Sequence, residues 1–358
     1  MSATDSRVSE RQLLRDSVRS LLNEHWPVDG AVERGQERGP VDAIWKQLAE
    51  HGLANLGTDP EEAGMREMLL VLNELGRASC PAPLLGGVAA NYAFGSARNA
   101  SPSTRELLDA VHCGSAAIAF SLGAFDGDAA AGRAEYADGI ATGRVAFVEG
   151  ALSATHYLVL IDSPAGVAIV CADAAGLTVT ATPGLAVPSL SEIVFDSCEA
   201  TFVELPRQRL TDVALIMRMA CGARAMGAAQ RAFDLALEHV VVRRQFGQFI
   251  GQFQAIQHKL ADCLTALDGA RLLLENAANA YDVDNPSWHV FASAALAFAG
   301  PALRQVVLEA IHALGAIGCA EEHEAPRHFR RVHADLVRFG GAPRARAEVA
   351  EYLLGTID

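Results

Sequence analysis

The sequence RRQFGQFIGQFQAIQHK, residues 243–259, lies between two long segments whose apolar residues recur every three or four positions. The recurring apolar or small residues are Leu215, Met219, Gly222, Met226, Ala229, Phe233 and Leu237 before it, and Phe253, Ile256, Leu260, Leu264 and Leu267 after it. This spacing places each set on one face of an α-helix. Gly247 and Gly251 interrupt the pattern, so the sequence predicts two antiparallel helices joined by a glycine-containing turn.

The turn also carries side chains that suit a ligand. Arg243 and Arg244 stand at its entrance, and Gln252, Gln254 and Gln257 open the following helix. Together they could hold an anion and a planar hydrogen-bonding group. Spacing alone leaves an alternative open, in which the arginines complement the negative end of the first helix and the glutamines face water.

Composition limits the classes of function. The chain has 358 residues, 51% of them hydrophobic, and a formal net charge of −14 without any basic run, which argues against a nucleic-acid partner. The cysteines show no metal-type or redox-type spacing: Cys80, Cys113, Cys171, Cys198, Cys221, Cys263 and Cys319. Dispersed cysteines, a polar N-terminus and no apolar run long enough to cross a bilayer predict a cytoplasmic protein without a membrane span.

The pattern of apolar residues changes twice along the chain. Residues 1–113 carry apolar stripes of helical period, and residues 209–358 carry longer ones. Between them, residues 114–208 contain short β-branched or alternating runs separated by turn residues. The expected strands are 116–122, 139–148, 157–162, 167–172, 177–182 and 193–203. We therefore predict an α+β, mostly α chain of three domains: 1–113 helical, 114–208 a β-barrel or sandwich, and 209–358 a helical bundle.

Three short sequence motifs in the helical part resemble motifs of a known family. They are GAAQRAFD at 227–234, RRQFG at 243–247 and FQAIQHKLAD at 253–262. In sequence and spacing they resemble the signature helix–turn–helix of acyl-CoA dehydrogenases, in detail over residues 210–270 and more loosely over residues 15–341. The resemblance implies the layout of that family, with N-terminal helices, a central β-barrel domain and a C-terminal four-helix bundle that oligomerises.

In that family the turn reaches across a dimer interface to the adenine and pyrophosphate of the FAD held by the neighbouring subunit. An arginine fork suits phosphate oxygens, and a phenylalanine can pack on a planar ring. A second cofactor-contacting motif of the family is partly retained as HALGAIG at 312–318, where His312 and Ala316 replace a glutamine and a glycine. The resemblance thus implies FAD as the cofactor, and these cofactor-binding residues: Arg243, Gln245, Phe246, Ile250, Phe253, Gln254, His312, Gly315 and Ala316.

The catalytic base of the family is missing from both of its usual positions. The family's reaction removes the α proton of an acyl-CoA thioester with a desolvated glutamate, while the β hydrogen leaves as a hydride to the flavin. By resemblance, Phe339 in the word RFGG at 338–341 occupies one glutamate position, and Met217 occupies the other. The resemblance therefore implies no catalytic residue in this chain.

The central domain departs from the family as well. Its flavin-covering loop, normally Glu-Pro-x-x-Gly-Ser-Asp, reads LGAFDGD at 122–128, and its Trp-Ile-Thr strand reads AFV at 146–148. Phe147 could still stack on a ring. By resemblance, the half-site that serves a neighbour's FAD is retained, whereas the half-site for the chain's own flavin has decayed.

A histidine-containing segment, residues 321–333, raises the alternative of a metal site. His323, His328 and His333 are five positions apart, which turns each by about 140° around a helix, so they cannot share one face. Pro326 also interrupts them. We expect no metal. Instead, the Glu322-His323 pair followed by FRR at 329–331 resembles a sequence motif that is common in actinobacterial members of the family that assemble from two different chains.

The resemblance as a whole implies a subunit of a heteromeric, FAD-dependent acyl-CoA dehydrogenase. A second acyl-CoA dehydrogenase-like subunit would supply the base in an α2β2 assembly. The substrate would be an acyl-CoA, by analogy a steroid side-chain thioester, and an electron-transferring flavoprotein would accept the electrons. Two alternatives stay open: a self-sufficient enzyme of this fold with an unidentified base, and a non-redox acyl-CoA-binding homo-oligomer.

Overall fold

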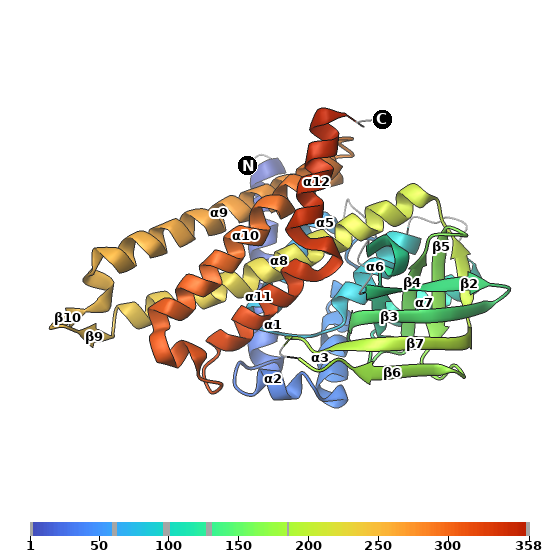
Figure 1. Ribbon diagram of the computed structural model, residues 1–358, viewed down its shortest axis with the longest axis horizontal. Coiled ribbons are helices and arrows are strands. Elements are labelled where there is room, and N and C mark those ends of the chain that lie inside the picture. Colours follow the sequence, from blue (N-terminus) through green and yellow to red (C-terminus); the bar gives the residue numbers. More distant parts are fainter. Residues whose placement is uncertain (1–2, 59–62, 96–100, 127–130, 185, 356–358) are drawn as a thin grey trace. The chain divides into compact units, whose positions relative to one another are not determined.

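The computed structural model describes residues 3–58, 63–95, 101–126, 131–184 and 186–355 (Figure 1). The chain divides into two units, the first drawn from residues 1–31, 69–80 and 221–358 and the second from residues 32–68 and 81–220. Three of the four boundaries along the chain fall inside helices, namely α2 (Ala31–Arg34), α5 (Met65–Arg77) and α8 (Arg207–Val240), and the fourth follows Cys80. The three-domain division predicted from the sequence stays a prediction.

The second unit is built around two four-stranded sheets. Their strand orders are β1-β4-β5-β8 and β2-β3-β7-β6, and all neighbours are antiparallel except β1 and β4. The strands are β1 (Ile118–Ser121), β2 (Gly132–Ala137), β3 (Ile140–Glu149), β4 (His156–Ile161), β5 (Gly166–Cys171), β6 (Leu177–Ala181), β7 (Leu190–Glu199) and β8 (Thr201–Glu204).

Alternate side chains of these strands make one apolar core. Val145, Val159, Val170, Ile193 and Phe195 lie in it, and each is at most 2% exposed. Successive side chains of a strand point to opposite faces, so an alternating strand can bury one face and leave the other in water. The predicted central β-domain is confirmed.

Two of the strand predictions differ from the structure. The expected strand 193–203 is two strands of different sheets, β7 and β8, separated at Ala200, whose amide donates to the carbonyl oxygen of Gly139 at 2.9 Å. Strand β2 was not expected, because its sequence GRAEYA contains no β-branched residue. Sheet membership depends on the pairing partner, which the sequence of a single strand does not contain.

Helices in the second unit are short and tied to the sheets. They are α3 (Arg38–Glu50), η1 (Leu53–Asn55), α6 (Leu84–Phe94), α7 (Pro102–His112) and η2 (Gly123–Asp126), with the short α2 (Ala31–Arg34) at its boundary. Trp45 of α3 donates its indole N–H to the carbonyl oxygen of Ala116 at 2.9 Å, just before β1. Every residue of α6 is buried, as expected for a helix that is apolar on all sides.

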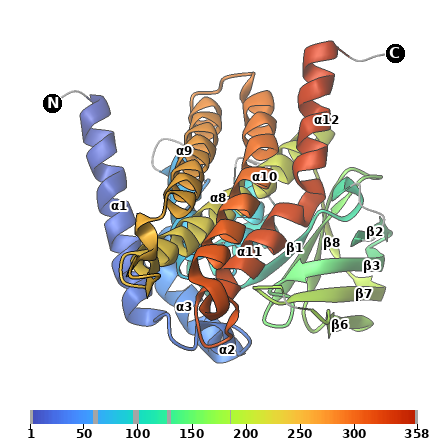
Figure 2. The same cartoon turned by 60° about the vertical axis from the view of Figure 1, so that its left-hand side comes forward.

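Long helices make up the first unit. Besides its parts of α5 and α8 it contains α1 (Ala3–His25), α9 (Gln254–Asp282), α10 (Trp288–Leu314), η5 (Gly315–Cys319), α11 (Ala325–Val337), η6 (Arg338–Gly340) and α12 (Gly341–Leu354). Figures 1 and 2 show α9 lying beside α10. The prediction of two long helices joined by a turn is confirmed in α8 and α9, and the mostly α composition of the chain is confirmed as well.

Helices α5 and α8 approach each other backbone to backbone at two glycines. A Cβ on Gly76 would lie 1.9 Å from the carbonyl oxygen of Arg224, and a Cβ on Gly227 would lie 1.8 Å from that of Asn73. The buried Arg224 side chain also pairs with Asp335 of α11, with Nε–Oδ2 and Nη2–Oδ1 distances of 2.9 and 2.6 Å. This two-point contact satisfies both buried charges and fixes α8 against α11.

One helical stretch is more apolar than predicted from the sequence. Residues Trp288–Cys319, which are α10 and η5, are long and apolar enough to cross a membrane by length and composition, and no other described helix is. However, 50% of the apolar window is buried inside the structure. Buried core helices of globular proteins have the same properties, so the stretch is weak evidence for a membrane span.

Candidate functional site

The connection between α8 and α9 is a small hairpin. Strand β9 (Arg244–Gln245) pairs antiparallel with β10 (Gln248–Phe249), which leaves Phe246 and Gly247 as the two central residues. The amide of Ile250 donates to the carbonyl oxygen of Arg243 at 2.9 Å and closes the ribbon. A short helical turn, η4 (Ile250–Gln252), then leads into α9. The hairpin thus gives a fixed frame to the predicted cofactor-binding residues.

Phe246 has an unusual backbone for a phenylalanine. The φ angles are 51° at Phe246 and 81° at Gly247, the positive pair required by a two-residue hairpin of type I′. Glycine, asparagine and aspartate are the usual residues there, and a left-handed backbone costs other L-residues roughly 1–2 kcal/mol. The Phe246 ring is nevertheless 92% exposed. The strained turn therefore holds an aromatic ring out in solvent.

The two arginines of the hairpin have different surroundings. The guanidinium carbon of Arg244 lies 4.6 Å from the ring centroid of Phe249, a cation–π contact across the ribbon. Arg243 is exposed, and its guanidinium makes no hydrogen bond or ion pair with any residue that the structure describes. Arg244 is thus engaged within the ribbon, whereas Arg243 is available to a ligand.

Two further residues of the predicted set lie where α9 begins. Phe253 is half-buried, and its ring meets that of Phe246 edge-on, with centroids 6.2 Å apart and an interplanar angle of 83°. Gln254 is the exposed first residue of α9. In the described part of the chain neither the Gln254 nor the Gln245 side chain has a hydrogen bond. The structure brings the two rings together and leaves both amides free for a ligand.

The second predicted cofactor-binding motif, residues 312–318, lies at the end of α10. His312, Gly315 and Ala316 are all exposed. Gly315 ends the helix with φ 66° and ψ −139°, and no atom lies within 4 Å of where its Cβ would be. Exposed backbone of this kind can approach a ligand closely.

Glu309, which is not among the residues predicted from the sequence, links the two predicted contact motifs. Its Oε2 accepts a hydrogen bond from Lys259 Nζ at 2.8 Å and lies 3.4 Å from His312 Nδ1. The hydrogen bond from Lys259 holds the pKa of Glu309 below its usual value, against the opposing effect of burial. Glu309 precedes His312 by three positions on one helix face, and that spacing could have indicated it.

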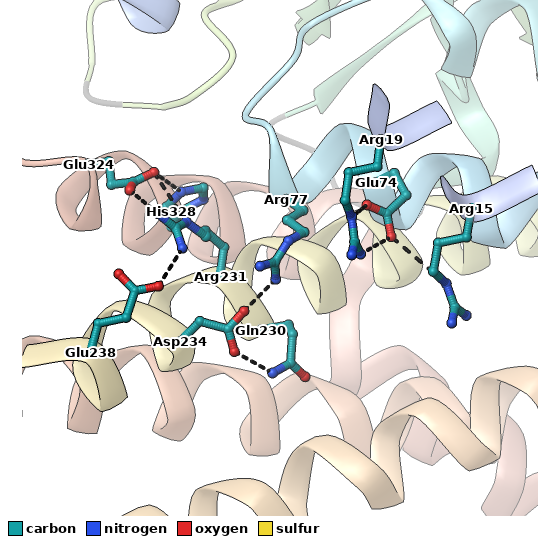
Figure 3. A network of polar contacts seen from close by, with 10 residues as sticks. All are labelled: Arg15, Arg19, Glu74, Arg77, Gln230, Arg231, Asp234, Glu238, Glu324 and His328. Carbon is teal, nitrogen blue, oxygen red and sulfur yellow. Dashed lines mark hydrogen bonds and ion pairs between the residues drawn. The ribbon is translucent and has the colours of Figure 1, made fainter. Parts of the chain in front are cut away.

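A second ionic cluster joins α8 to the segment before α11 (Figure 3). Glu324 pairs with Arg231, accepts from Arg327 Nη2 at 2.9 Å and lies 3.5 Å from His328 Nε2. Arg231 also donates to Glu238 at 3.1 Å. Burial opposes ionisation of Glu324, but the hydrogen bonds from His328 and Arg231 outweigh it and hold its pKa well below the usual range.

His328 itself is completely buried. Its Nδ1 lies 3.2 Å from the hydroxyl oxygen of Ser79. Burial lowers the pKa of His328 to about 4, although Glu324 acts to raise it, so the imidazole is neutral at pH 7. The histidine is therefore part of a structural cluster that joins α8, α11 and the turn that follows α5.

The histidines of this segment have different surroundings. His323 precedes α11, and the Nδ1 of His333 lies 2.9 Å from the carbonyl oxygen of Phe329. Across the described ranges, no group of three or more His, Cys, Asp or Glu side chains could hold a metal ion. All seven cysteines are free thiols.

The two positions that the resemblance assigns to the family's glutamate are buried and apolar. Met217 of α8 is 1% exposed, and Phe339 of η6 is 7% exposed. Phe339 has a left-handed backbone, with φ 60°, and Gly340 and Gly341 follow with φ of 88° and 54°. The Arg338 guanidinium carbon lies 4.7 Å from the centroid of the Phe339 ring. Neither position carries an ionisable side chain.

The second unit contains the residues that the resemblance assigns to the flavin pocket. Phe147 lies where the pairing of β3 with β7 shifts register, between Val145 and Val148, and its φ of 58° turns a 40% exposed ring outward. In the loop 122–128, the guanidinium carbon of Arg207 lies 5.5 Å from the Phe125 ring centroid. Gly127 and Asp128 lie outside the described residues.

A groove of about 660 Å³ opens along α9 and α10. The Lys259–Glu309 pair lines it, together with Cys263 and Phe298. Burial raises the pKa of the Cys263 thiol to about 11, so it is uncharged at pH 7. Large side chains on the same two helices remain exposed: Leu264, Leu272, Phe298 and Leu308, at 48%, 57%, 42% and 38%.

Comparisons with known proteins agree with this description. The sequence matches the acyl-CoA dehydrogenase N-terminal domain over residues 9–106 and the acyl-CoA dehydrogenase C-terminal domain over residues 211–353. Acyl-CoA dehydrogenase IpdE2 of Mycobacterium tuberculosis is 29% identical over 334 residues, which cover 90% of this chain and 91% of that protein.

Solved structures share the fold over nearly the whole chain. A variant of the Tcur3481–Tcur3483 steroid ACAD has a TM-score of 0.84 at 24% identity, covering 97% of this chain and 98% of that one. The ChsE4–ChsE5 complex from Mycobacterium tuberculosis has a TM-score of 0.82 at 22% identity, with coverage of 97% and 98%. Because two domain matches span most of its length, the chain belongs to the acyl-CoA dehydrogenase family.

Proposed function

We propose that this chain is the subunit without a base of a heteromeric, FAD-dependent acyl-CoA dehydrogenase. The observation that carries the proposal is the contrast between the open hairpin around Phe246 and the two buried positions, Phe339 and Met217, where a glutamate would act. The solved structures with this fold include the ChsE4–ChsE5 complex, whose name gives two different chains. A partner subunit would supply the base and the flavin pocket.

The described residues fit the adenine-pyrophosphate half of FAD. The unpaired Arg243 guanidinium suits a pyrophosphate oxygen pair, and the exposed Phe246 ring suits the face of a planar ring. Gln245 and Gln254 offer free amides, and the backbone at Gly315 is open. When bound, the flavin supplies the hydride acceptor for α,β-dehydrogenation.

Each residue would act on the cofactor by binding or orientation. Arg243 would neutralise the pyrophosphate, while Phe253 would support the Phe246 ring from its edge. Ile250 would keep the ribbon closed through its bond to Arg243, and His312 would be held in place by Glu309. The exposed backbone of Gly315 and Ala316 would lie along the cofactor.

The helical face of α9 and α10 supports assembly. Exposed apolar side chains beside a groove indicate a surface that is covered in the working protein. We propose an α2β2 heterotetramer with one FAD for each heterodimer. Finding four flavins in a tetramer, or a stable monomer of this chain, would contradict that assembly.

The remaining parts of the proposal rest on relatives. The substrate class is an acyl-CoA, by analogy a steroid side-chain thioester, and the name of the steroid ACAD supports a steroid substrate. The electron acceptor is an electron-transferring flavoprotein, and the compartment is the cytoplasm, in keeping with seven free thiols.

The test is the flavin content of the complex formed when this chain is co-purified with its partner. A hydrogen bond to a charged group contributes roughly 1.5–3 kcal/mol, so Arg243→Ala should weaken FAD binding by about 10- to 100-fold. Arg243→Lys should recover only part of this, because an ammonium cannot fork onto two oxygens.

Arg244→Ala is the matched control, since Arg244 is engaged with Phe249 on the same ribbon. It should leave flavin content nearly unchanged. Equal flavin in Arg243→Ala and the parent complex would remove the half-site proposal. A yellow, active preparation of this chain alone would favour the self-sufficient enzyme, and a colourless homo-oligomer that binds acyl-CoA would favour the non-redox alternative.

A further inference from the structure

The segment from Gly315 to Glu324 is held mainly at its two ends. It leaves α10 at Gly315 and reaches α11 at Ala325. Most of its residues are exposed, namely Gly315, Ala316, Ile317, Cys319, Glu321 and Glu322. A segment with so little burial depends on its anchors for a fixed position, because ordering each residue costs conformational entropy.

The anchor at the far end is an ionic contact with α8. Glu324 is 13% exposed at its side chain and pairs with Arg231, which is 21% exposed. A small apolar cluster of Leu235, Leu314 and Ala325, with Ile311 against it, supports the same contact. Arg231 and Leu235 therefore face the ends of the segment from the part of α8 that leads to the hairpin.

We infer that Arg231 and Glu324 are positioning residues of the cofactor-binding surface. They hold the segment that contains Gly315 and Ala316 against α8, the helix from whose end the hairpin projects. The two cofactor-contacting motifs, the hairpin around Phe246 and the segment that begins at Gly315, then stay at a constant distance from each other. The inference rests on the proposed function, because it assumes that both motifs contact the same cofactor.

The charges of the cluster explain why the carboxylate matters. Glu324 lies against Arg231 and Arg327, and also against the neutral His328. Without the carboxylate, the two guanidinium groups would lose the partly buried counter-charge that they share, and Arg231 would keep the more exposed Glu238. The segment that ends at residue 324 would then lose its anchor.

Glu324→Gln tests the inference because it keeps the size of the side chain and removes its charge. The FAD dissociation constant of the complex with the partner, measured by quenching of flavin fluorescence, should rise roughly tenfold. At saturating FAD, both kcat and KM for the acyl-CoA should return to the parent values, because the substrate site is not part of the cluster.

Glu321→Gln is the matched control. Glu321 lies in the same segment and pairs with Arg330, but its side chain is 69% exposed, and exposed pairs contribute little. Its FAD dissociation constant should equal that of the parent. If Glu324→Gln does not fold, Arg231→Lys decides instead: it keeps the charge, loses the fork, and should weaken FAD binding by a few-fold.

Two results would overturn the inference. One is an unchanged FAD dissociation constant in Glu324→Gln, or in Arg231→Lys where that variant decides, while Arg243→Ala weakens binding. The other is a loss of kcat that saturating FAD does not restore, which would mean a general structural role. If Arg243→Ala also leaves FAD binding unchanged, the proposed function itself fails, so the two failures can be told apart.

Discussion

The hairpin around Phe246 and the segment around Phe339 share one backbone device. Each phenylalanine has a left-handed backbone, with φ of 51° and 60°, and each is followed by a glycine of positive φ. Their surroundings are opposite, because the Phe246 ring is 92% exposed and the Phe339 ring is 7% exposed. At Phe339, burial of a large ring offsets the strain within the chain. At Phe246 the edge-on contact with Phe253 leaves the ring almost fully in solvent, so little burial offsets the strain.

The difference indicates what each segment depends on. A strained residue persists when its surroundings impose it or when a ligand uses it. Packing around the buried ring imposes the backbone of Phe339, and the two glycines that follow it also have positive φ. Phe246 is presented to solvent by a ribbon that fixes it. We therefore expect the first segment to respond to changes in stability and the second to changes in binding.

The largest expected effect concerns turnover. If the Phe339 segment has no chemical role, this chain with added FAD should oxidise acyl-CoA thioesters several powers of ten more slowly than the assembled complex, because no group is present to take the α proton. The measurement is acceptor reduction with the chain alone and after mixing with its partner. Turnover by the chain alone at a comparable rate would break the comparison.

The next effect is on stability at Phe339. Phe339→Asn keeps the left-handed backbone at low cost but removes a buried ring and buries an amide, so it should lower the free energy of unfolding by about 3–5 kcal/mol. Urea denaturation followed by circular dichroism measures this. Phe339→Leu, which stays apolar, should lose less and should leave kcat of the complex unchanged. A neutral Phe339→Asn would show that burial does not hold this segment.

A third effect separates the two regions by pH. The pKa of His328 is about 4 in the folded protein against an ordinary 6.5. Between these values the unfolded chain binds a proton that the folded chain does not, so stability falls as the pH falls from 6.5 towards 4, by about 3 kcal/mol in total. Glu324, whose pKa is depressed, adds a further loss below its ordinary value of 4.5.

His328→Gln should flatten the dependence between pH 6.5 and 4.5. The hairpin residues Arg244–Phe249 contain no group that titrates there, so hydrogen exchange of the ribbon amides, corrected for its intrinsic pH dependence, should not follow the same curve. A parallel pH response in both regions would mean that they open as one unit.

The smallest expected effect is at Phe246. Asparagine adopts a left-handed backbone readily, so Phe246→Asn should stabilise the free hairpin by about 1 kcal/mol. Protection of the Gln248 amide against hydrogen exchange should then rise about fivefold. The same variant should bind FAD more weakly in the complex, because the ring is lost. Lower protection in Phe246→Asn would show that the ring stabilises the free hairpin after all.

Much of the fold could be predicted from the sequence because the helices are long and strongly periodic. The joined pair α8 and α9, the buried α6 and most strands follow from spacing and from turn residues. The division of residues 193–203 between two sheets could not be predicted, since it depends on hydrogen bonds to strands far away in the sequence. The apolar length of α10 was not expected, because Arg304 and Glu309 interrupt the run in the second half of the helix.

For the candidate site, the sequence indicated the residues and the structure supplied their partners. The motifs around Arg243 and His312 could be found by their resemblance to the family. The bridge that Glu309 makes between Lys259 and His312 is a tertiary contact, so the structure was needed to find it. The positive φ of Phe246 was equally hidden, because phenylalanine is not a residue that predicts a type I′ turn. Whether the predicted site residues bind FAD stays a prediction.

Gly76 and Gly227 have a consequence for how this sequence can change over time. At each, the space for a side chain is occupied by a carbonyl oxygen of the opposing helix, 1.9 and 1.8 Å from the Cβ position. Even alanine would need α5 and α8 to move apart, and that movement would also disturb the Arg224–Asp335 pair. A library with every amino acid at these two sites, selected for folding, should return glycine alone, whereas the neighbouring surface positions drift freely.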